Sequence, residues 1–284
     1  MMAANRGRSL SRVGVHAVLA VGALVTVYPL IWLTSASLKE SVDILGDSPW
    51  NLLPSPATIQ NYTTGWKGVG QGVSFAQYTA NSLILAALTV VGSVISCSLA
   101  AYAFGRLRFR FKSFWFALML GSIMLPFEVV IIPQYILFNK IGWVNTYLPI
   151  LAPQFFAQNA FLVFLITQFV RSIPKEIDEA AAIDGAGPIR IYWSIVLPLS
   201  VPALATAAVL AFLASWSNLI APLIYLNDPK KYTLPLGLSS FLNESGAGNF
   251  GALMAMSAVA LIIPFIVFLT CQRYILRGVA INVR

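Results

Sequence analysis

Six long apolar segments constrain this chain more than any other feature of its sequence. They cover residues 13–33, 82–104, 114–132, 147–170, 199–224 and 252–272. Each is about as long as the 20 helical residues that a bilayer core requires. A segment that crosses lipid outside a closed barrel must be a helix, because lipid offers no partner to its backbone groups. The sequence therefore predicts an all-α, polytopic integral membrane protein with six transmembrane helices in a single domain, residues 1–284.

The composition agrees with a membrane protein and argues against a soluble one. Hydrophobic residues make up 58% of the chain and charged residues only 10%, and the mean hydropathy is +0.79. A net charge of +8 would suit a nucleic-acid partner. However, the Lys and Arg residues gather at the ends of the apolar segments instead of covering one face. We therefore expect membrane lipid around the chain and no nucleic acid as a partner.

The distribution of Lys and Arg predicts the orientation. Thirteen of them lie in the N-terminal tail, the second and fourth connections and the C-terminal end, and five lie in the other three connections. Cytoplasmic loops carry the excess of positive charge. We expect both termini and residues 171–198 in the cytoplasm, with the chain in the cytoplasmic membrane of a bacterium or archaeon. The first apolar segment exceeds the 7–15 residues of a signal-peptide core, so we expect it to be retained.

The connection between the fourth and fifth segments is acidic, although it lies on the basic side of the protein. Proline disfavours helix at the residue before it, so Pro174 predicts the end of the fourth span and the first residue of a new helix. Carboxylates follow at once, which suits the positive end of a helix dipole; they are Glu176, Asp178 and Glu179. Gly185 predicts the end of this helix in a left-handed conformation.

The rest of this connection predicts a compact element outside the membrane. Pro188 is expected to start a second helix, and Leu197-Pro198 to mark the return into the membrane. Residues 180–182 are alanines, which allow another molecule to approach the first helix closely. Anionic lipid would repel its carboxylates, so the pattern favours a protein partner with basic residues over a helix that lies on lipid.

This connection resembles the signature loop of ATP-binding-cassette (ABC) importer permeases. The matching residues are Glu179-Ala180-Ala181, Gly185, Ile195 and Leu197-Pro198, with nine residues between Gly185 and Ile195. Other motifs resemble the carbohydrate-uptake branch, and within it the smaller, six-span permease of the maltose-type pair. They are Asn81-Ser82, Ala101-Tyr102-Ala103, Ile132-Pro133, Asn145-Thr146-Tyr147, Arg171-Ser172-Ile173-Pro174 and the run from Thr233 to Leu238.

The resemblance implies a permease subunit that moves a sugar or oligosaccharide across the membrane. Its implied partners are a second homologous permease, an ATPase dimer that binds ATP-Mg, and an extracytoplasmic sugar-binding protein. The helix at residues 174–185 would enter a cleft of the ATPase. Glu179 would be its acidic anchor, and Gly185 would supply the turn after it. Ala180 and Ala181 would fill the cleft, on the face that they share with Asp184.

The chain itself has no Gly-x-x-x-x-Gly-Lys-Ser/Thr phosphate loop. We therefore expect a transport subunit with no enzymatic site and no cofactor of its own. Two segments depart from the family pattern. Residues 216–219 read Trp-Ser-Asn-Leu where members often carry Trp-Asn-Glu/Asp-Phe, and residues 278–284 replace a glycine-rich tail that ends in Lys-Gly. The second departure leaves a contact between the tail and the ATPase open.

Polar residues within the apolar segments are the candidates for a substrate path. Sugars require hydrogen-bonding and stacking groups rather than charges. The candidates are Glu128, Gln158, Asn159, Trp216 and Asn218. We expect the two asparagines to face a central cavity; the alternative is hydrogen bonding between helices. Pro126 and Pro133 predict a kink or break around Glu128, which would line the outer path or lie near the external interface.

Three other classes of protein compete with this interpretation. An ion-coupled secondary transporter usually needs several ionisable groups in its spans, and here only Glu128 qualifies. A membrane-embedded enzyme is disfavoured because the single histidine, His16, cannot build a catalytic or metal set. A scaffold would not need polar residues in its spans. An ABC permease for a glycerol-phosphate or polyol substrate also stays open, although no Lys or Arg in the spans would meet a phosphate.

Overall fold

The computed structural model describes residues 2–46, 48, 50–68, 72–243 and 249–280, with the backbone alone for residues 2–13, 45, 243 and 273–280. Within these residues all regular structure is helical, which confirms the predicted fold class. Helices long and apolar enough to span a membrane occur at residues 14–36, 75–106, 148–172 and 250–272. Two bent helix pairs pass the same test only when each pair is taken together. The candidate spans therefore number four, or the predicted six if each bent pair is one span, and the orientation of the termini stays a prediction.

Contacts divide the chain into two compact units. Unit 1 comprises residues 1–75 and 238–262, and unit 2 comprises residues 76–237 and 263–284. The last helix, α15 (Phe250–Ala280), contributes its first part to unit 1 and the remainder to unit 2. The predicted tail at residues 278–284 lies largely beyond the described part, since only Gly278, Val279 and Ala280 belong to α15.

Unit 1 begins with α1 (Met2–Ala36), whose apolar side chains from residue 14 onward are mostly exposed, as lipid contact requires. The connection after it contains α2 (Ser41–Gly46) and α3 (Gln60–Lys67). Tertiary bonds stabilise these short helices: the amide of Asn61 donates to the carbonyls of Ser37 at 2.9 Å and Lys39 at 2.7 Å.

Unit 2 is a bundle around α4 (Phe75–Arg106), α8 (Ala160–Ser172) and α12 (Val201–Trp216). Their contact includes small residues among larger ones, and of the small residues Ala101 and Ala207 are completely buried. Small side chains let helix backbones approach closely in a membrane protein. A Cβ atom on Gly105 would lie 2.6 Å from Cγ1 of Val170, so α4 and α8 meet here without room for a larger residue.

The third predicted span is a bent pair, α5 (Lys112–Ser122) and α6 (Phe127–Lys140), at 99° to each other. The predicted break near Glu128 is confirmed, and it falls just before that residue. Pro126 has no N–H for the carbonyl of Ser122 and disfavours helix at Leu125, so α5 stops at Ser122. Pro133 lies inside α6 and does not end it.

The fourth predicted span is not one continuous helix. It consists of α7 (Leu148–Leu151), the 3₁₀ helix η1 (Ala152–Phe156) and α8. Ala157 has a left-handed φ of +54° between η1 and α8. The expectation of an uninterrupted helix is wrong because Pro149 and Pro153 each remove a backbone donor within a few residues.

The fifth predicted span is interrupted as well. α12 stops at Trp216, and α13 (Ile220–Tyr225) starts after three intervening residues. In a continuous helix the carbonyl of Asn218 would accept from residue 222, which is a proline and has no N–H. At its other end, α12 follows the segment from Pro188 to Leu199 at a bend of 76°. Ser200 occupies this bend, and the predicted turn at Leu197-Pro198 lies inside α11 (Leu197–Leu199).

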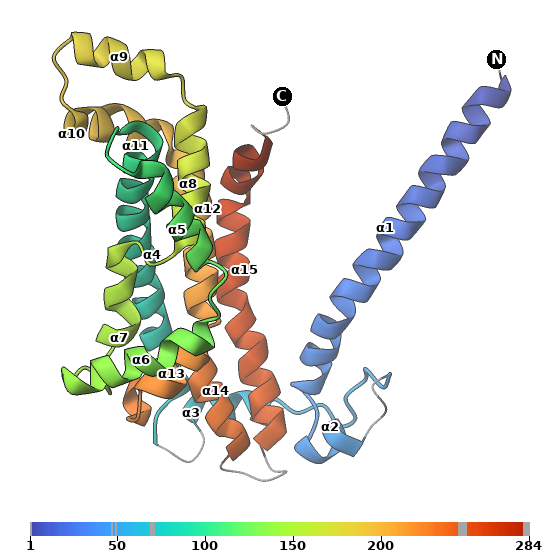
Figure 1. Ribbon diagram of the computed structural model, residues 1–284. Coiled ribbons are helices and arrows are strands. Elements are labelled where there is room, and N and C mark those ends of the chain that lie inside the picture. The colour runs from blue at the N-terminus through green and yellow to red at the C-terminus, as the bar shows by residue number, and fades with distance from the viewer. Residues whose placement is uncertain (1, 47, 49, 69–71, 244–248, 281–284) are drawn as a thin grey trace. The chain divides into compact units, whose positions relative to one another are not determined.

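The two ends of unit 2 carry different elements (Figure 1). The helices α9 (Lys175–Ile183) and α10 (Pro188–Ile191) lie at one end, beyond α8. The helices α6 and α13 lie at the opposite end. The bundle therefore separates α9 from the short loops that join the outer helices. Between α13 and α14 (Leu234–Asn243) is the 3₁₀ helix η3 (Pro229–Lys231).

Candidate functional site

The first helix of the 171–198 loop begins one residue later than predicted. Pro174 is the N-cap of α9, not its first helical residue, because its backbone is extended at φ −55° and ψ 134°. Ile173 before it is also extended, as a residue that precedes proline prefers to be. Glu176 and Asp178 lie in the first turn of α9, where the helix dipole favours negative charge.

The end of α9 has the geometry that the sequence predicts. Gly185 has a φ of +79°, which an L-residue with a side chain rarely adopts. Its N–H donates to the carbonyl of Ala182 at 3.1 Å, and the N–H of Ala186 donates to the carbonyl of Ala181 at 2.9 Å. This pair of bonds is the Schellman motif, which satisfies the last carbonyls of a helix. Pro188 starts α10 at its first position, as predicted.

The surface of the loop combines carboxylates with exposed apolar side chains. Glu179, Ala180 and Asp184 are exposed, whereas Ala181 is half-buried against the core of unit 2. The sequence interpretation missed the apolar part of this surface, although isolated apolar residues in a polar loop were visible. Its members are Ile183, Ile189 and Trp193, which are 87%, 77% and 57% exposed.

One carboxylate of the loop has a partner within the chain. The Oδ2 atom of Asp178 lies 3.0 Å from Nε of Arg106, at the end of α4. No local pattern indicates this ion pair, because 72 residues separate its members. Asp178 therefore differs from Glu179, which is exposed, and the acidic residues of the loop do not form one uniform surface.

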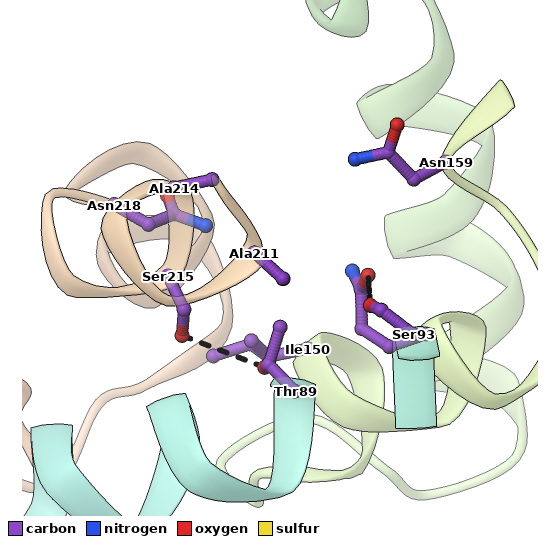
Figure 2. A pocket seen from close by; sticks show the side chains of 9 residues that line it. Thr89, Ser93, Ile150, Asn159, Ala211, Ala214, Ser215 and Asn218 are labelled. Atoms are coloured by element: carbon purple, nitrogen blue, oxygen red, sulfur yellow. Dashed lines mark hydrogen bonds between the residues drawn. The ribbon is translucent and has the colours of Figure 1, made fainter. Parts of the chain in front are cut away.

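A polar cavity of about 100 Å³ lies in the middle of unit 2 (Figure 2). Its lining comes from α4, α7, η1, α12 and the two helix breaks next to them. The lining residues are Thr89, Ser93, Ile150, Gln154, Asn159, Ala211, Ala214, Ser215 and Asn218. Every one of them is uncharged, so the cavity offers hydrogen bonds and apolar contacts but no ionic attraction.

Two of the predicted path residues, Asn159 and Asn218, line this cavity together. The Oδ1 atom of Asn159 accepts from the N–H of Leu162 at 3.1 Å and so caps α8. The Oδ1 atom of Asn218 accepts from the N–H of Ala221 at 3.2 Å at the start of α13. These bonds identify the oxygen of each amide. The amide nitrogens therefore point toward the space between the two residues, as Figure 2 shows.

The hydroxyl groups around the cavity bond between neighbouring elements. Ser93 donates to Oε1 of Gln154 at 3.1 Å, and Ser215 donates to Oγ1 of Thr89 at 3.4 Å. This is the helix-to-helix bonding that the sequence left open for the polar residues. The sequence interpretation passed over Thr89, Ser93 and Gln154. Thr89 and Ser93 lie four residues apart in an apolar segment, a spacing that places them on one helix face.

The other three predicted path residues lie elsewhere. Glu128 is exposed in the first turn of α6, and Gln158 is exposed beside Asn159. Trp216 is 7% exposed, and its ring stacks on Phe212 with centroids 5.7 Å apart, so it belongs to the packing of α12. Their assignment to the path rested on their hydrogen-bonding or stacking character, which does not determine which side chains face the cavity.

Comparison with known proteins supplies the family. A model described as "Binding-protein-dependent transport system inner membrane component" matches residues 92–281. The chain is 33% identical over 261 residues to the arabinooligosaccharides transport system permease protein AraQ of Halalkalibacterium halodurans, covering 92% of this chain and 91% of that protein. It is 32% identical over 275 residues to the sn-glycerol-3-phosphate transport system permease protein UgpE of Agrobacterium fabrum, covering 95% and 96%.

A solved structure supports the fold. It is titled "Crystal structure of a bacterial ABC transporter involved in the import of the acidic polysaccharide alginate", and it matches with a TM-score of 0.80. The match covers 95% of this chain and 98% of that one, at 24% sequence identity. The broken helices described above therefore belong to an architecture that occurs in an experimental structure.

Proposed function

This chain belongs to the family of inner membrane components of binding-protein-dependent transport systems, and on that premise we propose that it is the permease subunit of an ATP-driven sugar importer. As an ABC permease it works with an ATPase and a substrate-binding protein. We further propose a second homologous permease chain as its partner in the membrane. ATP-Mg would bind to the separate ATPase subunits, and this chain would carry the substrate.

The observation that carries the proposal is the exposed helix α9, which ends in a Schellman motif. It presents Glu179 and Ala180 to solvent, and Gly185 fixes where it ends. A cleft of the ATPase would receive this helix, with Glu179 against a basic residue and the exposed Ala180 against a cleft wall, while Ala181 packs on this chain's own core. The excess of Lys and Arg on the same side of the membrane supports a cytoplasmic position for the loop, where ATP is present.

The substrate that the cavity suits best is a neutral sugar or oligosaccharide. Its uncharged lining and its two amide donors suit hydroxyl and ring oxygens. AraQ, at 33% identity, is named for arabinooligosaccharides. The cavity in this single chain is smaller than a whole sugar site of about 300 Å³ or more, so the second permease would complete it.

A glycerol-phosphate ester is the second candidate, favoured by the 32% identity to UgpE. A phosphate group would need cationic side chains or several converging N–H donors, and the lining residues carry no positive charge. The binding protein encoded beside this chain decides between the two. We expect it to bind arabino-oligosaccharides in calorimetry and to ignore sn-glycerol 3-phosphate; the reverse result would establish the phosphate ester.

Uptake into proteoliposomes tests the coupling role. The vesicles contain this chain, its partner permease, the ATPase and the binding protein with its bound sugar. We expect the double variant Glu179→Lys with Gly185→Asp to abolish uptake, because it reverses the anchoring charge and distorts the turn after α9. The chain should still insert and purify in normal yield, since neither residue is buried.

A matched control makes the same chemical changes elsewhere. Glu40 is an exposed carboxylate of unit 1, and Gly187 has an ordinary φ of −74°. The double variant Glu40→Lys with Gly187→Asp should therefore import at the normal rate. Full uptake by the Glu179 and Gly185 variant would refute the assignment of α9 as the coupling helix.

A further inference from the structure

Three polar side chains on one face of α4 bind the 171–198 loop. Ser98, Tyr102 and Arg106 are separated by four residues each, so they lie in a row along the helix. The hydroxyl groups of Ser98 and Tyr192 are 2.7 Å apart. Tyr102 donates from its hydroxyl to the carbonyl of Pro188 at 2.9 Å. We call these three residues the polar row of α4.

Arg106 makes the strongest attachment in this row, because it reaches both the entry and the first turn of α9. Its Nη2 atom donates to the carbonyl of Ile173 at 2.7 Å, and its Nε atom lies 3.0 Å from the carboxylate of Asp178. The side chains of Arg106 and Asp178 are 4% and 17% exposed. A charged link with little access to water therefore joins α9 to α4.

This ion pair is poorly suited to a purely stabilising role. The Nε–H of Arg106 is not aligned on the carboxylate of Asp178. The Nη1 atom of Arg106 and the Oδ1 atom of Asp178 are buried without a hydrogen-bond partner among the described residues. Burial of two charges costs free energy that only well-satisfied geometry recovers, so two apolar residues often stabilise a fold as well. A pair with unused hydrogen-bonding capacity is better explained by the position that it gives to α9.

The same helix that holds the loop also lines the cavity. Thr89 and Ser93 of α4 line the cavity, and Arg106 lies 13 residues beyond Ser93 on the unbroken helix. At 1.5 Å per residue the two sites are about 20 Å apart. A movement of α9 that also moves Arg106 would therefore reach the cavity through α4, without passing through a loop.

We propose that Arg106 and Asp178 are positioning residues that couple α9 to α4, so that displacement of α9 by the ATPase changes the cavity. This inference rests on the proposed function of α9. Under that proposal the exposed Glu179 contacts the ATPase, whereas Asp178 faces inward and acts on this chain alone. The two carboxylates of α9 thus have different tasks, one between subunits and one within the permease.

The test uses the complete transporter in proteoliposomes and removes both charges together. The variant Arg106→Met with Asp178→Leu leaves no charge without a partner, so it should assemble with the ATPase. We expect its basal ATP hydrolysis to stay within twofold of the wild type. Stimulation of hydrolysis by the loaded binding protein, and sugar uptake, should both fall at least tenfold. The conservative variant Arg106→Lys keeps the charge opposite Asp178 and should recover most of the uptake.

A nearby arginine provides the matched control. Arg171 donates to the carbonyl of Phe104 at 3.3 Å and lies over the ring of Phe116, but it makes no contact of this kind with α9. Arg171→Met should therefore leave stimulated hydrolysis and uptake within twofold of the wild type.

The outcomes separate the inference from its premise. Normal uptake by the doubly neutral variant would overturn the positioning role, and so would loss of its assembly with the ATPase, which would indicate a structural role. Failure of the wild-type chain to import sugar with these partners would instead overturn the proposed function.

Discussion

The 171–198 loop and the polar cavity both form where helices stop, but different residues stop them. In the loop, α9 ends at Gly185 with a φ of +79°, and a proline begins the next helix. At the cavity, Asn159 and Asn218 lie in the breaks, and their side-chain oxygens bond the helix that follows. In the loop, backbone conformation ends the helix. At the cavity, the asparagine side chains that bond the next helix also supply the cavity's hydrogen-bond donors.

This difference determines how each region responds to substitution. In the loop, a change at the glycine alters the path of the backbone and leaves the exposed residues of α9 unchanged. At the cavity, replacement of either asparagine by alanine removes a helix cap and a donor together. A single variant therefore tests the loop, while the cavity requires a pair of variants that separates its two roles.

The largest effect is expected in the loop, from Gly185→Val. No atom would lie within 4 Å of the added Cβ, so the cost comes from the left-handed backbone alone. That conformation costs an L-residue about 1–2 kcal/mol, and more when the side chain is β-branched. We expect the end of α9 to change direction and sugar uptake to fall more than tenfold, measured in proteoliposomes.

The control for this variant is Gly187→Val, two residues away. Gly187 has an extended backbone at φ −74° and ψ 167° and also has open space around it. Its uptake should match the wild type. Equal loss of uptake in both variants would show that the loop resists bulk rather than a change of backbone conformation.

The loop could be predicted closely because its structure depends on residues near in sequence. Gly185 and Pro188 have the predicted conformations, and the start of α9 differs by one residue. Such features follow from steric rules that act within a few residues. The ion pair between Arg106 and Asp178 could not be predicted, since it depends on how α4 packs beside the loop.

The cavity could be predicted only in part, because its lining depends on where helices break. The polar character of Asn159 and Asn218 was visible, and both line the cavity. Trp216 was predicted from the same segment but packs on Phe212. In a continuous helix the directions of side chains 216 and 218 would follow from the helical repeat. The break that starts at residue 217 removes this constraint, so the direction of one no longer predicts that of the other. Prolines indicated breaks, but tertiary packing decided where each helix resumed.

A smaller effect is expected at the cavity from two replacements of Asn159. Serine keeps an oxygen that can cap α8 but has no amide donor, whereas alanine has neither. We expect Asn159→Ala to lower the free energy of unfolding by about 1 kcal/mol, and Asn159→Ser by a few tenths. Both should raise the KM for sugar uptake about 3- to 10-fold, because each loses a hydrogen bond to substrate.

Thermal unfolding in detergent and the concentration dependence of uptake measure the two quantities separately. If Asn159→Ser has a normal KM, the carboxamide serves only as a cap and the cavity loses one of its two proposed substrate donors. The contrast with the loop would then become weaker, because both regions would contain residues at helix ends with purely structural tasks.

The smallest effect is expected from Ser93→Ala, which removes the bond from α4 to Oε1 of Gln154. A hydrogen bond between helices in a membrane protein contributes about 0.6 kcal/mol on average. We expect a loss of that size in the free energy of unfolding. Gln154 would gain freedom to turn, so the KM for sugar uptake should change less than about threefold.

Ser122→Ala is the matched control, because the hydroxyl of Ser122 donates only to the carbonyl of Met119 in the preceding turn. Its loss should leave both quantities unchanged within error, since the bond joins no second helix. If Ser93→Ala raised the KM as far as Asn159→Ser does, the hydroxyl groups of Thr89 and Ser93 on α4 would bind substrate directly. The cavity would then be formed by helix faces as much as by helix ends, and the comparison with the loop would lose its basis.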